Sequence, residues 1–198
     1  MPFWSTNFGE ETTLKDPKRA FRFTVSITGI DSANGGPLVW YATSVAKPSF
    51  EVTASEHKFL NHTFFYPGNV KWNTIDLKMV DPAGDPDVAA TLAAMISASG
   101  YSPPTDSTTE SFTSISKAKA AGALGTIIIS QIDSNGLPIE KWTLINSFAT
   151  KVDFGGELSY GEEKLTEYSM TIQYDWARVE TLEPSSAVAL GGDNFFGI

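Results

Sequence analysis

The sequence predicts a mainly β protein, an antiparallel β-sandwich or partly open barrel with one short α-helix. Several short segments alternate apolar and polar side chains with the period of two that a half-buried strand requires, and Gly, Pro and Asn separate them. Only one stretch combines a helical pattern with a clear start and stop. At 198 residues and 41% hydrophobic, the chain can bury one core of its own.

The chain divides into three parts. We expect an N-terminal arm over residues 1–16, a β domain over residues 17–178 and a C-terminal extension over residues 179–198. Both ends carry isolated aromatic side chains in segments without a sustained period, and such side chains dock on other surfaces. The inter-subunit contacts of these arms are therefore expected to involve Phe3, Trp4, Phe195 and Phe196.

The first strand is predicted within residues 20–30, where aromatic and aliphatic residues alternate with polar ones. A turn over residues 34–36, which read Asn-Gly-Gly, leads to a second strand within residues 38–45, so the two are expected to form a hairpin. Residues 48–61 alternate only weakly and carry several charges. We interpret them as an excursion, partly strand and partly exposed loop.

A chain reversal is predicted at Pro67 and Gly68, because proline presets φ at the first corner of a turn and glycine can take a positive φ. A new strand then begins near Trp72. The apolar phase slips by one residue between Trp72 and Ile75, which predicts a β-bulge near Asn73.

One helix is predicted after this strand. Asp85 is expected to cap it, Pro86 suits its first position, and Gly100 lies beyond its end. Its apolar stripe consists of Leu92, Met95 and Ile96. Residues 117–124 are ambiguous, since they are too rich in Ala for a strand and contain a Gly that disfavours a long helix.

The second half of the chain predicts a hairpin and a long closing strand. Residues 126–132 and 139–148 flank an Asn-Gly turn at residues 135–136, which is a strong hairpin signal. The closing strand, residues 168–176, has the clearest alternation of the whole sequence. Its polar face carries Thr171, Gln173 and Asp175.

The segment after the excursion joins a turn, a Trp and a strand in one unit. Its residues are Tyr66-Pro67-Gly68, Lys71-Trp72, Ile75 and Leu77-Lys78. This order resembles the signature of contractile tail tube proteins, the T4-like family that includes the inner tubes of related injection machines. The likeness extends from the basic residues 15–19, through the signature, to Trp142 and the strand that ends at Trp176.

This resemblance implies a non-enzymatic structural subunit of a phage tail tube. Members of that family form hexameric rings whose sheets join into a lumen-lining β-barrel, and the stacked rings conduct DNA during genome ejection. The implied partners are tail sheath and baseplate proteins, and the implied location is the virion, after assembly in the host cytoplasm. The signature and core positions are Tyr66, Pro67, Gly68, Lys71, Trp72, Ile75, Leu77, Trp142 and Trp176. The candidate lumen-facing residues are Thr171, Gln173 and Asp175.

The sequence contains no motif for catalysis, a metal or a cofactor, so we expect no enzyme. It has no cysteine and therefore neither a disulfide nor a thiolate nucleophile. His57 and His62 lie outside any metal-binding motif and are interpreted as solvated loop residues. The spacing of Asp81, Asp85 and Asp87 is interrupted by prolines and does not suit a calcium loop.

The net charge of −9 disfavours tight binding to phosphates, although it allows DNA to be passed along. No apolar run approaches the ~20 residues of a membrane-spanning helix. Two alternatives to a phage tail tube stay open. One is the inner tube of a phage-like contractile injection system, which delivers protein. The other, from a different class, is a monomeric β-barrel module that binds a ligand through its aromatic residues.

Overall fold

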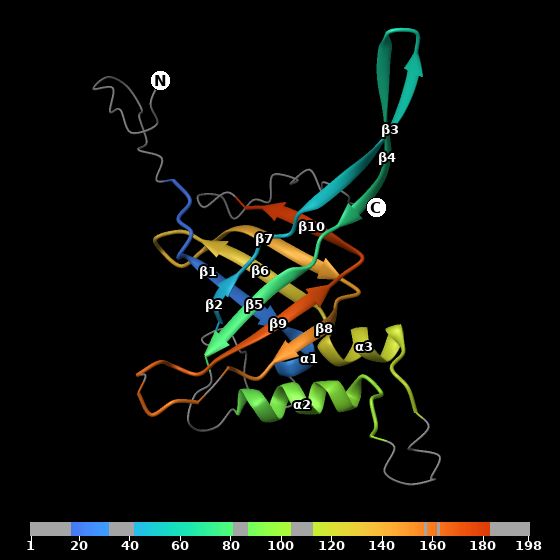
Figure 1. The fold of residues 1–198 in the computed structure, drawn as a ribbon. Coiled ribbons are helices and arrows are strands. Elements are labelled where there is room, and N and C mark those ends of the chain that lie inside the picture. Colours follow the sequence, from blue (N-terminus) through green and yellow to red (C-terminus); the bar gives the residue numbers. More distant parts are fainter. Residues whose placement is uncertain are drawn as a thin grey trace, which may run out of the picture.

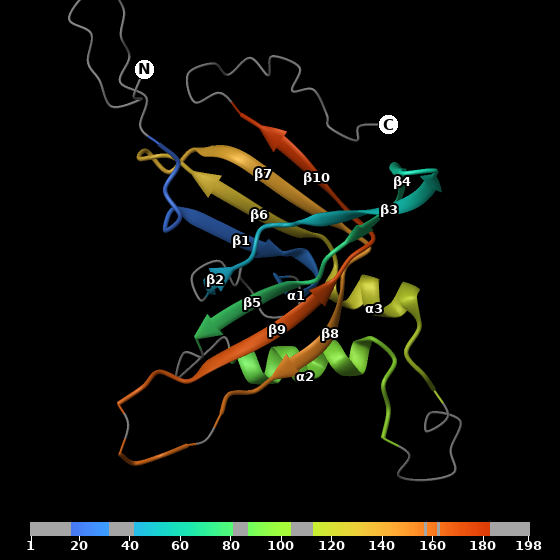
Figure 2. The ribbon, with the colours of Figure 1, turned by 45° about the horizontal axis from the view of Figure 1, so that its top comes forward.

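The computed structural model describes residues 17–31, 42–80, 87–103, 113–156, 158–161 and 163–182. In this part of the chain, two four-stranded antiparallel sheets enclose a common core, helices lie at one end of the core, and a two-stranded ribbon projects outward (Figures 1 and 2). The sheets do not close into a barrel. The predicted fold class is confirmed. The N-terminal arm, residues 1–16, lies outside the described residues, as do residues 183–198 of the C-terminal extension and the Asn-Gly-Gly turn. The first residues of that extension, 179–181, belong to the last strand of the sandwich.

The first sheet has the strand order β1-β6-β7-β10. Its strands are β1 (Phe23–Ile27), β6 (Ile127–Ile132), β7 (Pro138–Ile145) and β10 (Trp176–Thr181). The predicted hairpin of β6 and β7 is confirmed. Gly136 has a φ of 79° in its turn, and the Asp133 carboxylate accepts the backbone N–H groups of Asn135 and Leu137, each at 2.8 Å.

The second sheet has the strand order β2-β5-β9-β8. Its strands are β2 (Ala42–Val45), β5 (Ile75–Val80), β8 (Phe148–Asp153) and β9 (Glu167–Gln173). The predicted hairpin of the first two strands is therefore wrong, because β1 pairs with β6 and β2 pairs with β5. The Ile-rich β6 offers β1 a better partner, since Val25 and Ile27 stand opposite Ile129 and Ile127.

The closing strand is broken, which corrects the prediction of a continuous strand over residues 168–176. β9 ends at Gln173 and β10 begins at Trp176. Between them the chain crosses from the second sheet to the first, and the backbone N–H of Asp175 donates to the Ile145 carbonyl at 3.1 Å. Burial of alternate residues extends as far as Tyr174, which is 2% exposed, whereas in β10 the buried residue is Ala177 and Trp176 is half-buried.

Three helices occur in the described residues where one was predicted. They are α1 (Thr28–Asp31), α2 (Val88–Ala98) and α3 (Lys117–Leu124). Asp87 caps α2 by accepting the Ala90 N–H at 3.0 Å, two residues later than the expected Asp85, which lies outside the described residues. Ser116 caps α3 in the same way, so residues 117–124, which were ambiguous in the sequence, form a helix.

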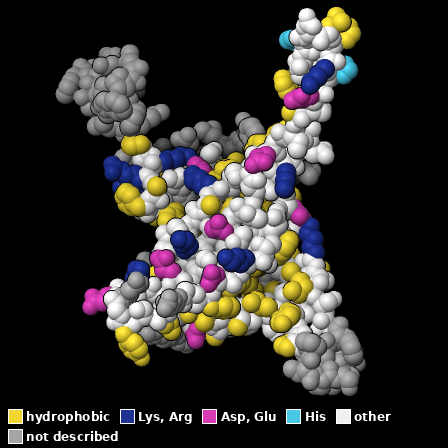
Figure 3. Space-filling model, in the orientation of Figure 1, with side chains coloured by type: hydrophobic (Ala, Val, Ile, Leu, Met, Phe, Trp, Pro, Cys, Tyr) yellow, Lys and Arg dark blue, Asp and Glu magenta, His cyan; other side chains and the backbone are white. Residues whose placement is uncertain are grey.

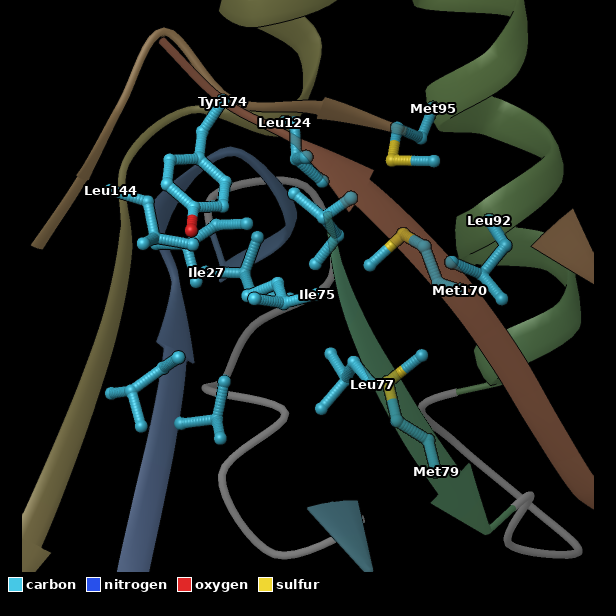
Figure 4. Close-up of a cluster of buried hydrophobic side chains, with 14 of the residues drawn as sticks. Ile27, Ile75, Leu77, Met79, Leu92, Met95, Leu124, Leu144, Met170 and Tyr174 are labelled. Atoms are coloured by element: carbon cyan, nitrogen blue, oxygen red, sulfur yellow. The ribbon is translucent and has the colours of Figure 1, made fainter. Parts of the chain in front are cut away.

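The core lies between the two sheets. Ile75 and Leu77 of β5 and Met170 of β9 face Ile27 of β1 and Leu144 of β7 (Figure 4). From the helices, Leu92, Met95 and Leu124 close this core at one end (Figure 4). Burial of this apolar surface stabilises both sheets together.

Candidate assembly interface

A two-stranded ribbon, residues 50–72, projects from the sandwich and is exposed along almost its whole length (Figures 1 and 2). Its strands β3 (Phe50–Phe59) and β4 (His62–Trp72) pair antiparallel around a tight turn that begins at Leu60. Every residue of β3 is exposed, and in β4 all are exposed except Thr63 and Trp72. The predicted excursion is thus strand from Phe50 onward.

The Pro67-Gly68 pair does not reverse the chain, so the predicted turn is wrong. Both residues lie within β4 at a change of register, where Val52 stands opposite Val70 but Ala54 stands opposite Pro67. Proline is tolerated at such a bulge because no ladder hydrogen bond needs its missing N–H. A Cβ added to Gly68 would lie 2.5 Å from the Oγ1 of Thr53, so this close approach requires glycine.

The β-bulge expected near Asn73 is also wrong. The apolar phase changes there because the chain leaves the ribbon at Trp72 and enters the second sheet at Ile75. Asn73 fixes this crossing through Ser49. Its backbone N–H donates to the Ser49 carbonyl at 2.9 Å, and its side-chain amide donates to the Ser49 hydroxyl oxygen at 3.2 Å.

Trp72 joins the base of the ribbon to the core of the sandwich. Its side chain is half-buried, with ring centroids 5.2 Å from Phe50 and 5.8 Å from the buried Tyr174. Both ring pairs are tilted, an arrangement that aromatic quadrupoles favour. The orientation of the ribbon therefore depends on this aromatic contact.

The other signature residues separate into core and surface. Buried in β5 are Ile75 and Leu77. Exposed on the ribbon are Tyr66 and Lys71. Half-buried in the first sheet are Trp142 and Trp176. The signature thus spans the junction between the ribbon and the body.

The ribbon exposes large apolar side chains along its length, and Figure 3 shows hydrophobic patches at its tip beside charged and His side chains. These apolar residues are Phe50, Val52, Phe59, Leu60, Phe64, Phe65, Tyr66 and Val70. A two-stranded hairpin is marginal in water by itself, and an apolar surface of this kind marks an interaction site. This exposed apolar ribbon was not predicted from the sequence. Its signal was the consecutive aromatic run 64–66, because neighbouring strand residues point to opposite faces and cannot share one core.

Two of the candidate lumen residues, Thr171 and Gln173, lie on β9 and are half-buried. The Thr171 hydroxyl donates to Oδ1 of Asp76 on the neighbouring strand at 2.7 Å. Asp76 and Lys78 are exposed, while the residues between and beside them are buried. The outer face of the second sheet is therefore polar at its centre.

Asp175, the third candidate, is separated from the other two by the crossing from β9 to β10. Its carboxylate accepts from Lys117 Nζ at 2.7 and 2.8 Å and from the Asn146 side-chain amide at 2.9 Å. These hydrogen bonds hold the pKa of Asp175 below its usual value. The carboxylate thus links the crossing to α3.

Replacing Asp175 by lysine is expected to lower the melting temperature, because the variant loses the ion pair and places a second ammonium beside Lys117. The pair is solvent-exposed, so the cost stays at or below about 1 kcal/mol. Asp175→Asn should cost less, since it keeps one acceptor and adds no charge. Thermal unfolding at low and high salt measures both. An unchanged melting temperature for Asp175→Lys at low salt contradicts this prediction.

A second polar cluster surrounds Glu140, which is buried at the inner side of β7. Lys18 and Lys47 both form ion pairs with its carboxylate, the second at 2.7 Å, and the Trp142 indole N–H donates to it at 2.6 Å. Lys47 also donates to the Gln131 side chain at 2.8 Å. The cluster joins the chain after β2 to the first sheet, and sequence analysis gave no sign of it.

Burial of Glu140 raises its pKa, but the hydrogen bonds from Lys18, Lys47 and Trp142 outweigh burial and lower the pKa to about 2. A carboxyl whose pKa is lower in the folded state stabilises the fold above its unfolded pKa, and this contribution is lost as the pH falls. Between about pH 5 and pH 2, we expect Glu140 to account for the loss of about 2 kcal/mol, less than the full shift because both lysines are half exposed.

The test compares the native chain with Glu140→Gln by urea unfolding across this pH range. The difference in free energy of unfolding between the two proteins should shrink as the pH falls, because only the native chain loses the Glu140 contribution. A difference that is constant with pH contradicts the assignment.

The histidines and the remaining acidic residues can be compared with the requirements of a metal site only where the structure describes them. No group of three or more His, Cys, Asp or Glu side chains in the described ranges is placed to hold a metal ion. His62 packs edge-on against Phe64, with ring centroids 4.7 Å apart, on the exposed ribbon. The described helices include none that is both long and apolar enough to cross a membrane.

Solved structures of other proteins share this architecture. No family model and no curated protein matches the sequence. Among solved structures, a chain of the PVC sheath/tube terminator of an extracellular contractile injection system superposes with a TM-score of 0.60. The two are 15% identical, and the match covers 85% of this chain and 100% of that one. The fold is the tail-tube fold.

Two further structures share the tail-tube fold. A chain of the anti-feeding prophage baseplate has a TM-score of 0.59 at 14% identity, covering 85% of this chain and 99% of that one. A chain of the PVC sheath-tube complex has a TM-score of 0.54 at 16% identity, covering 84% of this chain and 93% of that one. The resemblance seen in the signature is thus confirmed at the level of the fold, although the identities are low.

Proposed function

We propose that this protein is a non-enzymatic structural subunit of a contractile, phage-like tail, in which hexameric rings stack into a tube. The observation that carries the proposal is the exposed apolar ribbon on a tail-tube fold. Eight large apolar side chains exposed to water on a two-stranded hairpin are unfavourable in an isolated monomer. Contact with neighbouring subunits covers them.

Ring closure is supported by the open edges of the sheets. In the described structure, β1 and β10 each pair on one side only, as do β2 and β8 in the second sheet. Unpaired antiparallel edges favour addition of further strands, and natural proteins cover or pair them. Lateral pairing around a closed ring removes these edges without forming an open-ended aggregate.

The conduit is proposed to carry DNA during genome ejection, with tail sheath and baseplate proteins as partners and the virion as the location. The polar face around Asp76 and Thr171 and the net charge of −9 suit a lumen that does not grip phosphates. The inner tube of a protein-delivering injection system is the second candidate. It is favoured by two solved structures of the same fold, because both belong to an extracellular contractile injection system.

Negative-stain electron microscopy of the purified protein tests the proposed function. Rings or tubes are expected, whereas a small monomer at all concentrations supports the alternative of a ligand-binding module. The cargo is tested on intact particles from the native source. Nuclease-protected DNA inside the particles supports a phage tail, and its absence from active particles supports an injection system.

A further inference from the structure

An apolar pocket of about 600 Å³ opens at the end of the sandwich away from the helices. It lies beside Phe23 at the start of β1, whereas α1 follows Ile27 at the other end of that strand. Its walls include Phe21, Phe23, Val45 and Trp142, with Lys18 and Lys47 among them. Phe21 is 71% exposed, and in Figure 3 hydrophobic side chains lie next to Lys and Arg at the corner where the described chain begins.

We propose that this pocket receives the N-terminal segment, residues 1–16, of a neighbouring copy of the chain. This inference rests on the proposed function and identifies the receptor for one terminal arm. The segment offers Phe3, Trp4 and Phe8 to an aromatic-lined pocket. Aromatic side chains that fill such pockets dominate the energy of protein interfaces.

The charges of the two surfaces are complementary. Lys18 and Lys47 share the single carboxylate of Glu140, so this group keeps a net positive charge. In the N-terminal segment, Glu10 and Glu11 follow Phe8 after one glycine. An aromatic side chain in the pocket therefore brings two carboxylates to the lysine-bearing wall.

A neighbouring copy is the better source of the segment than the same copy. Residues 17–21 are all exposed, and Lys18 and Phe21 among them form part of the pocket wall. Within the same copy, the segment would have to turn back between Phe8 and Lys18, because the Glu140 carboxylate holds Lys18 on the pocket wall. Sixteen extended residues reach about 50 Å, well beyond the ~15 Å radius of gyration of a domain of this size.

Disulfide trapping tests the proposal, because the chain contains no cysteine. Ser5→Cys places a thiol beside Trp4, and Ser44→Cys places one on the pocket wall, both as nearly isosteric changes. The two single variants are mixed, assembled and oxidised. A disulfide between them can only be intermolecular, and we expect a dimer on a non-reducing gel. The double variant should give a ladder of linked subunits.

The matched control replaces Ser5→Cys by Asn194→Cys, which places the thiol beside Phe195 in the other arm. Three outcomes would each overturn the inference. They are a disulfide formed with Asn194→Cys but not with Ser5→Cys, a disulfide formed only within one chain of the double variant, and no disulfide in assembled tubes. In the last case the proposed function stands, because tubes are present. Absence of tubes from the unmodified protein overturns the proposed function instead. Adding Trp4→Ala and Phe8→Ala should reduce the trapped dimer about tenfold or more, as loss of a buried aromatic anchor predicts.

Discussion

Replacing Trp72 by alanine is expected to destabilise the protein by about 3 kcal/mol and to release the ribbon from the body. Trp→Ala in a core costs roughly 3–5 kcal/mol, and the lower end applies because Trp72 is half-buried. The variant loses the ring contacts with both Phe50 and Tyr174. Urea unfolding measures the loss of stability, and hydrogen exchange of the ribbon amides measures its release.

Trp72→Phe is the matched control, since a smaller ring keeps part of both aromatic contacts. It should retain most of the stability and most of the exchange protection. If Trp72→Ala unfolds at the same urea concentration as the native protein and its ribbon amides exchange at the same rate, Trp72 does not join the ribbon to the core. The role that the signature gives to this residue would then be wrong.

The sequence predicted local structure better than pairing between distant segments. The hairpin at Asn135-Gly136 was predicted correctly because its turn and both strands lie within one short stretch. The partner of β1 was not, because β6 lies about a hundred residues away and nothing near β1 indicates which apolar strand it meets. The Lys18–Glu140 ion pair was missed for the same reason, since 122 residues separate its members.

Two further predictions differed from the structure because one sequence pattern is compatible with two backbone arrangements. Pro-Gly is typical of a turn, but the same glycine permits the close approach to Thr53 at a bulge. Alternation from Tyr168 to Trp176 is typical of one strand, but the chain changes sheets after Gln173, and in β10 the core residue is Ala177 and not Trp176. In both cases the tertiary contact decided, and the sequence contains no separate signal for it.

For the candidate interface, the sequence predicted aromatic contacts at the two terminal arms but not at the ribbon. The predicted arm contacts lie outside the described residues and stay predictions. The ribbon forms because β3 and β4 pair with each other and with neither four-stranded sheet. Strands that alternate weakly, such as residues 50–59, have no buried face to set their pattern.

Removing the apolar residues at the ribbon tip is expected to abolish tube assembly while leaving the subunit folded. The variant Phe59→Ser, Leu60→Ser, Phe65→Ser replaces side chains that are 62, 89 and 64% exposed. Since the free subunit buries little of them, its melting temperature should change by no more than a few degrees. In an assembled tube the same side chains are proposed to be covered, and loss of three apolar anchors costs several kcal/mol per contact.

The matched control carries the same number of changes at exposed apolar sites off the ribbon, namely Leu158→Ser, Tyr160→Ser and Leu165→Ser, where exposure is 86, 114 and 75%. Light scattering and negative-stain microscopy compare the three proteins at equal concentration. Tubes from the control but not from the tip variant show that the ribbon itself makes the contact, beyond any general effect of surface hydrophobicity. Tubes of normal length and stability from the tip variant contradict the proposed role of the ribbon, because its most exposed apolar side chains would then contribute nothing to association.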